Sequence, residues 1–135
     1  MTQLTTEDAQ AILRRNEVLF SRADLPAILG GFHNDVIVKF ADIPEIRGKA
    51  ALEKFLAARF ARQKGYRLRK ALRAFEPQSG TIVGTWTGEW EDGRTGKAMR
   101  GRGTEILIVR DGLCVEWDAT FNMWEDGAGP ATTLL

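Results

Sequence analysis

The stretch AMRGRGTEILIVRDGLCVEWDATFNMW, residues 98–124, decides the fold that this sequence predicts. Two long runs of strand-forming residues, 98–110 and 113–124, lie on either side of the dipeptide Asp111-Gly112. Asp-Gly is typical of a two-residue hairpin loop, because both positions need a positive backbone φ that these residues tolerate. The stretch therefore predicts a long antiparallel hairpin near the end of the chain.

Two further strand-like runs, residues 66–75 and 81–90, precede this hairpin, and an isolated run covers residues 36–41. Clusters of turn-forming residues separate the longer runs from one another. Strands that follow one another through short turns usually pair as neighbours. The second half of the chain therefore predicts a four-stranded antiparallel meander.

The first half predicts three helices. The first begins at Thr5 or Thr6, whose hydroxyl can accept a hydrogen bond from a free backbone N–H of the first turn. The second follows Asp24, and the third covers residues 49–62, with apolar side chains at helical spacing. Helices followed by strands indicate an α+β fold, in which three N-terminal helices pack on a curved, mainly antiparallel sheet.

Length and composition are those of one globular domain. The chain has 135 residues, of which 44% are hydrophobic and 27% charged, so it can bury a core without metal or disulfide. We expect a single domain over residues 1–124 and a flexible tail over residues 125–135. The one cysteine, Cys114, excludes an intrachain disulfide and a zinc site of several thiolates, and is expected to be a buried, inert thiol.

No apolar run approaches the roughly 20 residues of a membrane-spanning helix, and residues 1–8 lack the segments of a signal peptide. We therefore expect a cytoplasmic protein outside the membrane. We also expect neither metal nor cofactor. His33 is the single histidine and has no neighbouring ligand set, and no glycine-rich phosphate loop precedes a helix.

Basic residues are concentrated between residues 47 and 73, where ten lysines and arginines accompany one acid, Glu53. Such a stretch either attracts an anion or a nucleic acid, or forms a solvated face whose charges pair with acids on neighbouring strands. The whole chain has a net charge of only +1. That balance disfavours binding to a phosphate backbone.

The Asp111-Gly112 loop also predicts the register of the last hairpin. With this loop, facing residue numbers sum to 223, so Glu105 faces Asp118, with Asn122 further along the same face. Two opposed carboxylates in a buried site share a proton near neutral pH and can act as a general acid or base. Glu116, two residues before Asp118 on this face, is the second candidate.

The other face of the last strand is apolar and carries Val115, Trp117, Ala119, Phe121 and Met123. If that face is the core, the acids of the strand face water. If a ligand pocket instead lies on the acidic face, the outer face of the sheet is free for a homodimer contact through Val115, Trp117, Ala119 and Phe121.

Several aromatic residues are candidates for the wall of a ligand pocket. Trp86 and Trp90 share one face of a strand, with glycines between them, and either form a flat wall for a ring-shaped ligand or fill the core. Phe40 and Tyr66 are further candidates. His33 is either a second acid–base group at the pocket mouth or a helix-end residue favoured by the helix dipole.

A series of short motifs follows a characteristic order along nearly the whole chain. They are Arg47-Gly48, Phe55-Leu56, Phe60-Ala61, Tyr66-Arg67-Leu68, Ala74-Phe75, Glu89-Trp90, Arg100, Gly103, Glu105, Gly112-Leu113 and Ala119 to Asn122. In their order and spacing, the chain resembles the SnoaL-like branch of the nuclear-transport-factor-2-like superfamily. It is most similar to a group of short bacterial proteins of that superfamily.

The resemblance implies a cystatin-like cone, in which a curved sheet wraps around a pocket and the outer sheet surface commonly forms a dimer. In SnoaL-type cyclases an Asp near the end of the final strand is the acid–base group, and Asn122 stands at that position here. Asparagine can hydrogen-bond a carbonyl or enolate oxygen but does not exchange a proton. The general base is then one of Glu105, Asp118 and Glu116.

Together these features favour a cofactor-independent isomerase, cyclase or hydrolase that acts on a small, largely apolar molecule. Glu105 or Asp118 would move the proton, and Asn122 would hold the substrate oxygen. The alternative is a non-catalytic module that binds a ligand or a protein partner.

Overall fold

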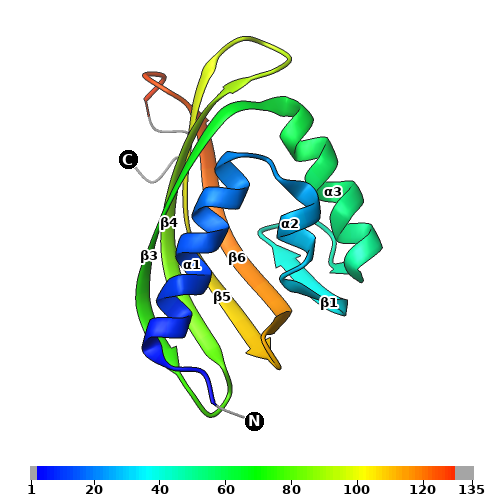
Figure 1. The fold of residues 1–135 in the computed structure, drawn as a ribbon. Helices are drawn as coiled ribbons and strands as arrows, with labels where there is room; N and C mark the ends of the chain where they lie inside the picture. Colours follow the sequence, from blue (N-terminus) through cyan, green and yellow to red (C-terminus); the bar gives the residue numbers. More distant parts are fainter. Residues whose placement is uncertain (1–2, 130–135) are drawn as a thin grey trace.

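The computed structural model describes residues 3–129, which form a helical layer on one side of a single curved sheet (Figure 1). The helices are α1 (Thr6–Ser21), α2 (Leu25–Leu29) and α3 (Lys49–Arg62). The strands are β1 (Phe32–Phe40), β2 (Ile46–Arg47), β3 (Gln63–Glu76), β4 (Thr81–Asp92), β5 (Ala98–Arg110) and β6 (Leu113–Glu125). The predicted α+β fold, with three helices on a curved sheet, is confirmed.

The six strands lie in the order β2-β1-β6-β5-β4-β3. Strands β3 to β6 form the predicted antiparallel meander, while β1 joins β6 in parallel and β2 pairs with β1 at the edge. The last strand of the chain therefore lies in the middle of the sheet. Its inward side chains and those of β5 are covered by the helices.

The short strand β2 was not predicted, and the starts of β1 and β3 differ most from those that the sequence predicts. β1 begins at Phe32, where its backbone already pairs with Cys114 of β6. β3 follows α3 without a break, because Gln63 pairs with Asp92 at the far end of β4. Gly65 lies inside β3 at a register shift and has a φ of 63°.

Helix α1 closes the free edge of the sheet at β3. Edge strands expose backbone N–H and C=O groups that need partners. The N–H of Leu68 donates to Ser21 Oγ at 3.1 Å, and the N–H of Lys70 donates to Glu17 Oε2 at 2.7 Å. Arg14 donates to the carbonyl oxygen of Lys70 at 2.8 Å. Three side chains of α1 therefore fix the backbone of β3 around Lys70.

The last hairpin starts in the predicted register and then shifts. Asp111 and Gly112 have φ values of 53° and 78°, as a tight two-residue loop requires, and Arg110 pairs with Leu113. Val115 is then an extra residue in β6, a β-bulge that leaves it without a partner in β5.

Beyond the bulge, Glu105 pairs with Ala119, and Asp118 pairs with Ile106 on the opposite face of the sheet. The predicted facing pair of Glu105 and Asp118 is therefore wrong. A one-residue slip moves every later side chain of a strand to the other face. The prediction assumed an unbroken ladder, and a bulge leaves no clear mark in the sequence.

The shifted register places the apolar face of β6 against the helices. Trp117 packs among Phe20, Phe32 and Phe40, with ring centroids 5.6, 5.4 and 4.6 Å from its own. Burying a large apolar side chain contributes about 1.5–3 kcal/mol, whereas an unpaired buried carboxylate costs several kcal/mol. The register that buries Trp117 and leaves Asp118 in contact with water is therefore the stable one.

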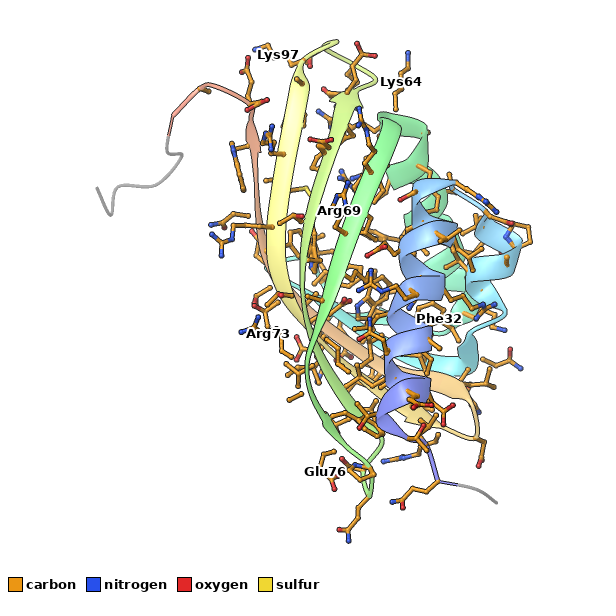
Figure 2. All side chains as sticks on the ribbon, turned by 60° about the vertical axis from the view of Figure 1, so that its left-hand side comes forward. Phe32, Lys64, Arg69, Arg73, Glu76 and Lys97 are labelled. Carbon is orange, nitrogen blue, oxygen red and sulfur yellow. The ribbon has the colours of Figure 1, made fainter. Side chains whose placement is uncertain are left out.

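The prediction that Val115, Trp117, Ala119 and Phe121 form a homodimer contact is wrong, because this face of β6 is turned toward the core. Trp117 and Ala119 are buried in the core, and Phe121 packs against it. In Figure 2 the labelled Phe32 lies on the helical side of the sheet, whereas Arg73 projects from the outer side. The outer side is thus formed by the alternate residues of each strand.

Basic residues of the 47–73 stretch do not form one surface. Arg62 pairs with Asp92 at 2.6 Å and Arg67 with Glu89 at 3.5 Å, so neighbouring strands supply acids as one interpretation predicted. Lys70 points into the core instead.

The end of the chain is described up to residue 129. Glu125 ends β6, and Asp126 pairs with Arg100 at 3.0 Å, while residues 130–135 of the predicted tail lie outside the described residues. Within residues 3–129, no helix has the length and apolar character needed to cross a bilayer.

Asp92 joins the end of α3 to the β4–β5 turn and should make stability depend on acid pH. Hydrogen bonds from Arg62 and Thr95 hold the pKa of Asp92 well below its usual range. Because the folded pKa is the lower one, this stabilisation is complete above about pH 4 and is lost as the pH falls toward the folded pKa. Asp92→Asn should lower the urea midpoint at pH 7 and weaken its decrease between about pH 4 and 2.

The control is Asp118→Asn, which removes a carboxylate from the outer face of the sheet. It should change the urea midpoint at pH 7 far less than Asp92→Asn does, because Asp118 makes none of the hydrogen bonds that hold Asp92. An unchanged pH dependence in Asp92→Asn would contradict the assignment.

Candidate functional site

A cavity of about 170 Å³ lies between the helices and the inner side of the sheet. Its wall is mainly aromatic and includes Phe40, Phe55, Tyr66, Trp86, Trp117 and Phe121. An engineered apolar cavity of about 150 Å³ is large enough to hold benzene. The cavity therefore has the size for a small ring system.

Trp86 lies flat against the sheet because the residue beside it in β5 has no side chain. Trp86 pairs with Gly103, and a Cβ atom at Gly103 would lie 2.9 Å from the Trp86 ring and 2.7 Å from Phe121 Cβ. Glycine at this position leaves the space that both aromatic side chains occupy. Trp86 therefore lines the cavity, whereas Trp90 does not line it and packs edge-on against Tyr66, with ring centroids 5.7 Å apart.

A buried ion pair lies in the cavity wall. Lys70 Nζ donates to both carboxylate oxygens of Glu105, at 2.8 Å to Oε1 and 2.7 Å to Oε2. Their side chains are 3% and 1% exposed. An ion pair this deeply buried loses most of its hydration, so it needs good geometry and further hydrogen bonds to be tolerated.

Neighbouring side chains provide a further hydrogen bond to the ion pair and the space that it needs. Trp117 Nε1 donates to Glu105 Oε1 at 3.0 Å, and Lys70 Nζ lies 5.8 Å from the ring centroids of Phe20 and Trp117. Glu105 pairs with Gly84 of β4, where a Cβ atom would lie 3.6 Å from Oε2. Lys70 on β3 can therefore reach across β4 to Glu105 on β5.

One acceptor position of the Glu105 carboxylate has no donor among the described residues. Each carboxylate oxygen offers about two lone-pair positions. Lys70 and Trp117 occupy both positions on Oε1, while Oε2 receives a bond from Lys70 alone. The free acceptor position of the carboxylate is therefore on Oε2.

Three more polar side chains line the cavity: Arg59, Gln63 and Tyr66. Arg59 is half-buried, and Gln63 is buried at the junction of α3 and β3. Burial raises the pKa of the Tyr66 phenol well above its usual range, an effect that nearby Arg59 opposes and Glu105 reinforces. Tyr66 is therefore a neutral O–H donor at neutral pH.

Only some of the candidate residues lie together. Glu105 lies in the cavity wall with the aromatic candidates Phe40, Tyr66 and Trp86. The other candidates lie elsewhere because the bulge turns alternate residues of β6 outward.

Asp118 and Asn122 lie on the outer face of the sheet, and Glu116 pairs there with Lys39 at 3.2 Å. His33 is in β1, not at the end of the second helix, and its Nδ1 accepts a hydrogen bond from the N–H of Asp35. His33 does not line the cavity. The interpretation in which the last strand's acids face away from the core is confirmed for these residues.

Lys70, Arg59 and Gln63 are the polar site residues that sequence reasoning missed. Lys70 alternates with Leu68 and Leu72 along a strand, so its position on the inner face could have been found from the period of two. Arg59 stands at helical spacing from Leu52, Phe55 and Leu56, but no pattern distinguishes a cavity-lining arginine from a solvated one.

Neither a metal site nor a reactive thiol is evident in residues 3–129. They contain no group of three or more His, Cys, Asp and Glu side chains placed to hold a metal ion. Burial raises the pKa of the Cys114 thiol to about 12, and Sγ donates to the carbonyl oxygen of Glu116 at 3.2 Å. Cys114 is therefore protonated at neutral pH and is not a nucleophile.

Residues 13–117 match the model of the SnoaL-like domain family. This match spans most of the chain, and the chain belongs to that family. None of the curated proteins matches the sequence.

Solved structures share the fold at low sequence identity. An NTF2-like protein of unknown function from Burkholderia pseudomallei is 19% identical, with a TM-score of 0.70 over 84% of this chain and 90% of the other. The LEH-like epoxide hydrolase of M. tuberculosis is 14% identical, with a TM-score of 0.67 over 87% and 84%. TerC, co-crystallised with polyporic acid, is 23% identical, with a TM-score of 0.68 over 84% and 91%. The fold is thus the NTF2-like cone.

Breaking the buried pair from one side should destabilise the protein strongly. Lys70→Met leaves the Glu105 carboxylate buried without its cation, which should lower the free energy of unfolding by about 3–5 kcal/mol. The double variant Lys70→Met/Glu105→Gln should recover most of this loss, because the amide oxygen still accepts the Trp117 hydrogen bond. Urea denaturation at pH 7 measures both.

Lys64→Met is the matched control, since Lys64 is exposed near the start of the same strand (Figure 2). It should change the unfolding free energy by less than about 0.5 kcal/mol. A double variant no more stable than Lys70→Met would contradict the role assigned to the pair.

Proposed function

We propose that this chain binds a small, largely apolar molecule in the inner cavity and that Glu105 transfers a proton on it without a cofactor. The observation that carries the proposal is the Lys70–Glu105 pair in the wall of an aromatic cavity. Glu105 is the one carboxylate among the described residues that line this cavity. Membership in the SnoaL-like domain family supports a small molecule as the ligand.

The chemistry follows from the free acceptor position on Glu105 Oε2. A substrate C–H or O–H directed at this oxygen would give up its proton to it, and the carboxyl group would return the proton at another atom. Lys70 and Trp117 hold the carboxylate in one orientation, so little reorganisation is needed during the reaction. Proton transfer by a positioned side chain typically accelerates a reaction by a factor on the order of 10²–10⁴.

Charge that develops on a substrate oxygen would also find donors in the cavity. The Tyr66 hydroxyl and the Gln63 amide both line it. Donors that point at a developing negative charge in an apolar site stabilise it more than water does. This set of groups suits an isomerase, a cyclase or a hydrolase, and the fold shared with an LEH-like epoxide hydrolase agrees with that range.

A non-catalytic ligand-binding module is the alternative. The same pair would then only orient a ligand, since both oxygens of Glu105 already carry hydrogen bonds from Lys70. The two functions differ in whether a carbon-bound proton is removed, which a probe reaction can measure. A cytoplasmic location and the absence of nucleic-acid binding stay predictions from the sequence.

The probe is 5-nitrobenzisoxazole, which opens to a coloured cyanophenolate when a base removes its carbon-bound proton. The wild-type protein should accelerate this reaction, and Glu105→Gln should reduce the rate at least about 100-fold. The double variant Lys70→Met/Glu105→Gln should be equally slow. It also lacks the carboxylate but leaves no buried lysine unpaired, so a low rate in both variants is not explained by misfolding of Glu105→Gln alone. The measurement is the rise of phenolate absorbance.

Asp118→Asn and Glu116→Gln are the controls, because both carboxylates lie outside the cavity on the opposite face of the sheet. Both should keep the wild-type rate. Equal rates in wild type and Glu105→Gln would refute the catalytic proposal. The alternative would then hold if small aromatic molecules still bound both proteins.

We also propose that the chain forms a homodimer through the outer face of the sheet, as its resemblance to this superfamily implies. The corrected contact is centred on Ile106, which is 40% exposed and pairs with Val83 of β4 on that face. Ile108 lies next to them. An exposed cluster of branched apolar side chains is typical of a contact surface.

Light scattering after size exclusion should give a dimer for wild type and a monomer for Ile106→Lys, because a buried unpaired lysine would disfavour the contact. The control is Val18→Lys. Val18 is 45% exposed but lies on α1, on the helical side of the sheet. A wild-type monomer at about 100 µM, or a dimer of Ile106→Lys, would contradict this proposal.

A further inference from the structure

Arg59 lies in the cavity wall without an acidic partner. It comes from the third turn of α3 and is half-buried. In the part of the chain that the structure describes, its one side-chain contact within hydrogen-bonding distance is to Met123 Sδ, at 3.5 Å. Among residues 3–129, no carboxylate lies within ion-pair distance of Arg59, so its partly buried guanidinium has no ionic partner there.

The acids that could have paired with Arg59 are already bound. Both oxygens of Glu105 accept from Lys70, and Asp92 accepts two hydrogen bonds from Arg62, one helical turn beyond Arg59. The cavity wall therefore carries two cations, Lys70 and Arg59, and one anion. Its net charge is +1 while its surface is mostly aromatic.

Because Arg59 is partly buried, its positive charge favours anionic ligands over neutral ones. Burial lowers the pKa of Arg59, although Tyr66 acts in the opposite direction, so the charged form is less well solvated than in water. A guanidinium offers five N–H donors in a plane that matches a carboxylate. An anionic oxygen in the cavity would replace the hydration that Arg59 has lost.

We infer that the cavity selects organic anions that combine an apolar ring with an anionic oxygen, and that Arg59 binds this oxygen while the ring lies among the aromatic side chains. The inference rests on the proposed use of the cavity as a binding site. It adds to that proposal the charge of the ligand and the residue that recognises it.

Tyr66 and Gln63 are placed to complete the recognition. Both line the cavity, and neither side chain has a hydrogen-bond partner among the described residues. The neutral phenol of Tyr66 can donate to the same anionic oxygen as Arg59. Trp86 and Phe121, with ring centroids 5.8 Å apart, provide apolar surface for the ring.

The test compares benzoate with benzamide, which have the same shape and differ in charge. Titrations followed by the NMR signals of the tryptophan indole groups give the two dissociation constants. Wild type should bind benzoate about 10- to 100-fold more tightly than benzamide, as expected for charge-assisted hydrogen bonds. Arg59→Gln should remove this preference, with little change in the affinity for benzamide.

Arg69→Gln is the matched control, because Arg69 lies on the outer face of β3, away from the cavity (Figure 2). It should keep the wild-type preference for benzoate. Arg59→Gln should also melt at or above the wild-type temperature, since no carboxylate loses its partner. A melting temperature well below wild type would show a structural ion pair and overturn the inference.

The outcomes separate this inference from the proposed function. Equal binding of the two ligands by wild type overturns the anion selectivity and leaves the binding cavity in place. A preference that persists in Arg59→Gln overturns the role of Arg59. If neither ligand shifts the indole signals up to its solubility limit, both the inference and the proposed cavity binding fail.

Discussion

The extra residue Val115 in β6 determines which side chains face the interior. It reverses the alternation of the strand, so that Trp117 lies on the same side as Glu105 and donates a hydrogen bond to it. Without this bulge, Asp118 would be buried beside Glu105 and the ring of Trp117 would be exposed. The hydrophobic contribution of the aromatic cluster and the cost of burying a second carboxylate both favour the bulged form.

The Lys70–Glu105 pair depends on several elements that are distant in sequence. Helix α1 fixes the backbone of Lys70 at the sheet edge, and Gly84 leaves room for the contact across β4. An ion pair buried in this way stabilises less than an apolar core would. Its position in the wall of a cavity therefore suggests a role in binding or chemistry, which is why the proposed function is centred on Glu105.

The cavity combines a mainly apolar surface with a positive charge. Aromatic side chains from β1, α3, β4 and β6 form most of its surface, while Arg59 adds a positive charge that no acid of residues 3–129 pairs. A ligand with a ring and an anionic oxygen would satisfy both. Proton transfer by Glu105 and anion recognition by Arg59 involve different atoms, so each can be present without the other.

The sequence by itself determined the order of the three helices and of five of the six strands, the tight loop at Asp111-Gly112 and the choice of Glu105, Tyr66, Phe40 and Trp86 as candidates. These follow from local periodicity, turn chemistry and residue type, which act within a few residues. Only the tertiary structure decided the register beyond Val115, the inward position of Lys70 and which acids of residues 3–129 pair with cations other than Arg59. Those features depend on which distant side chains share the interior. Burial determines the free-energy cost of placing a charge there, and also the cost of shifting a strand by one residue.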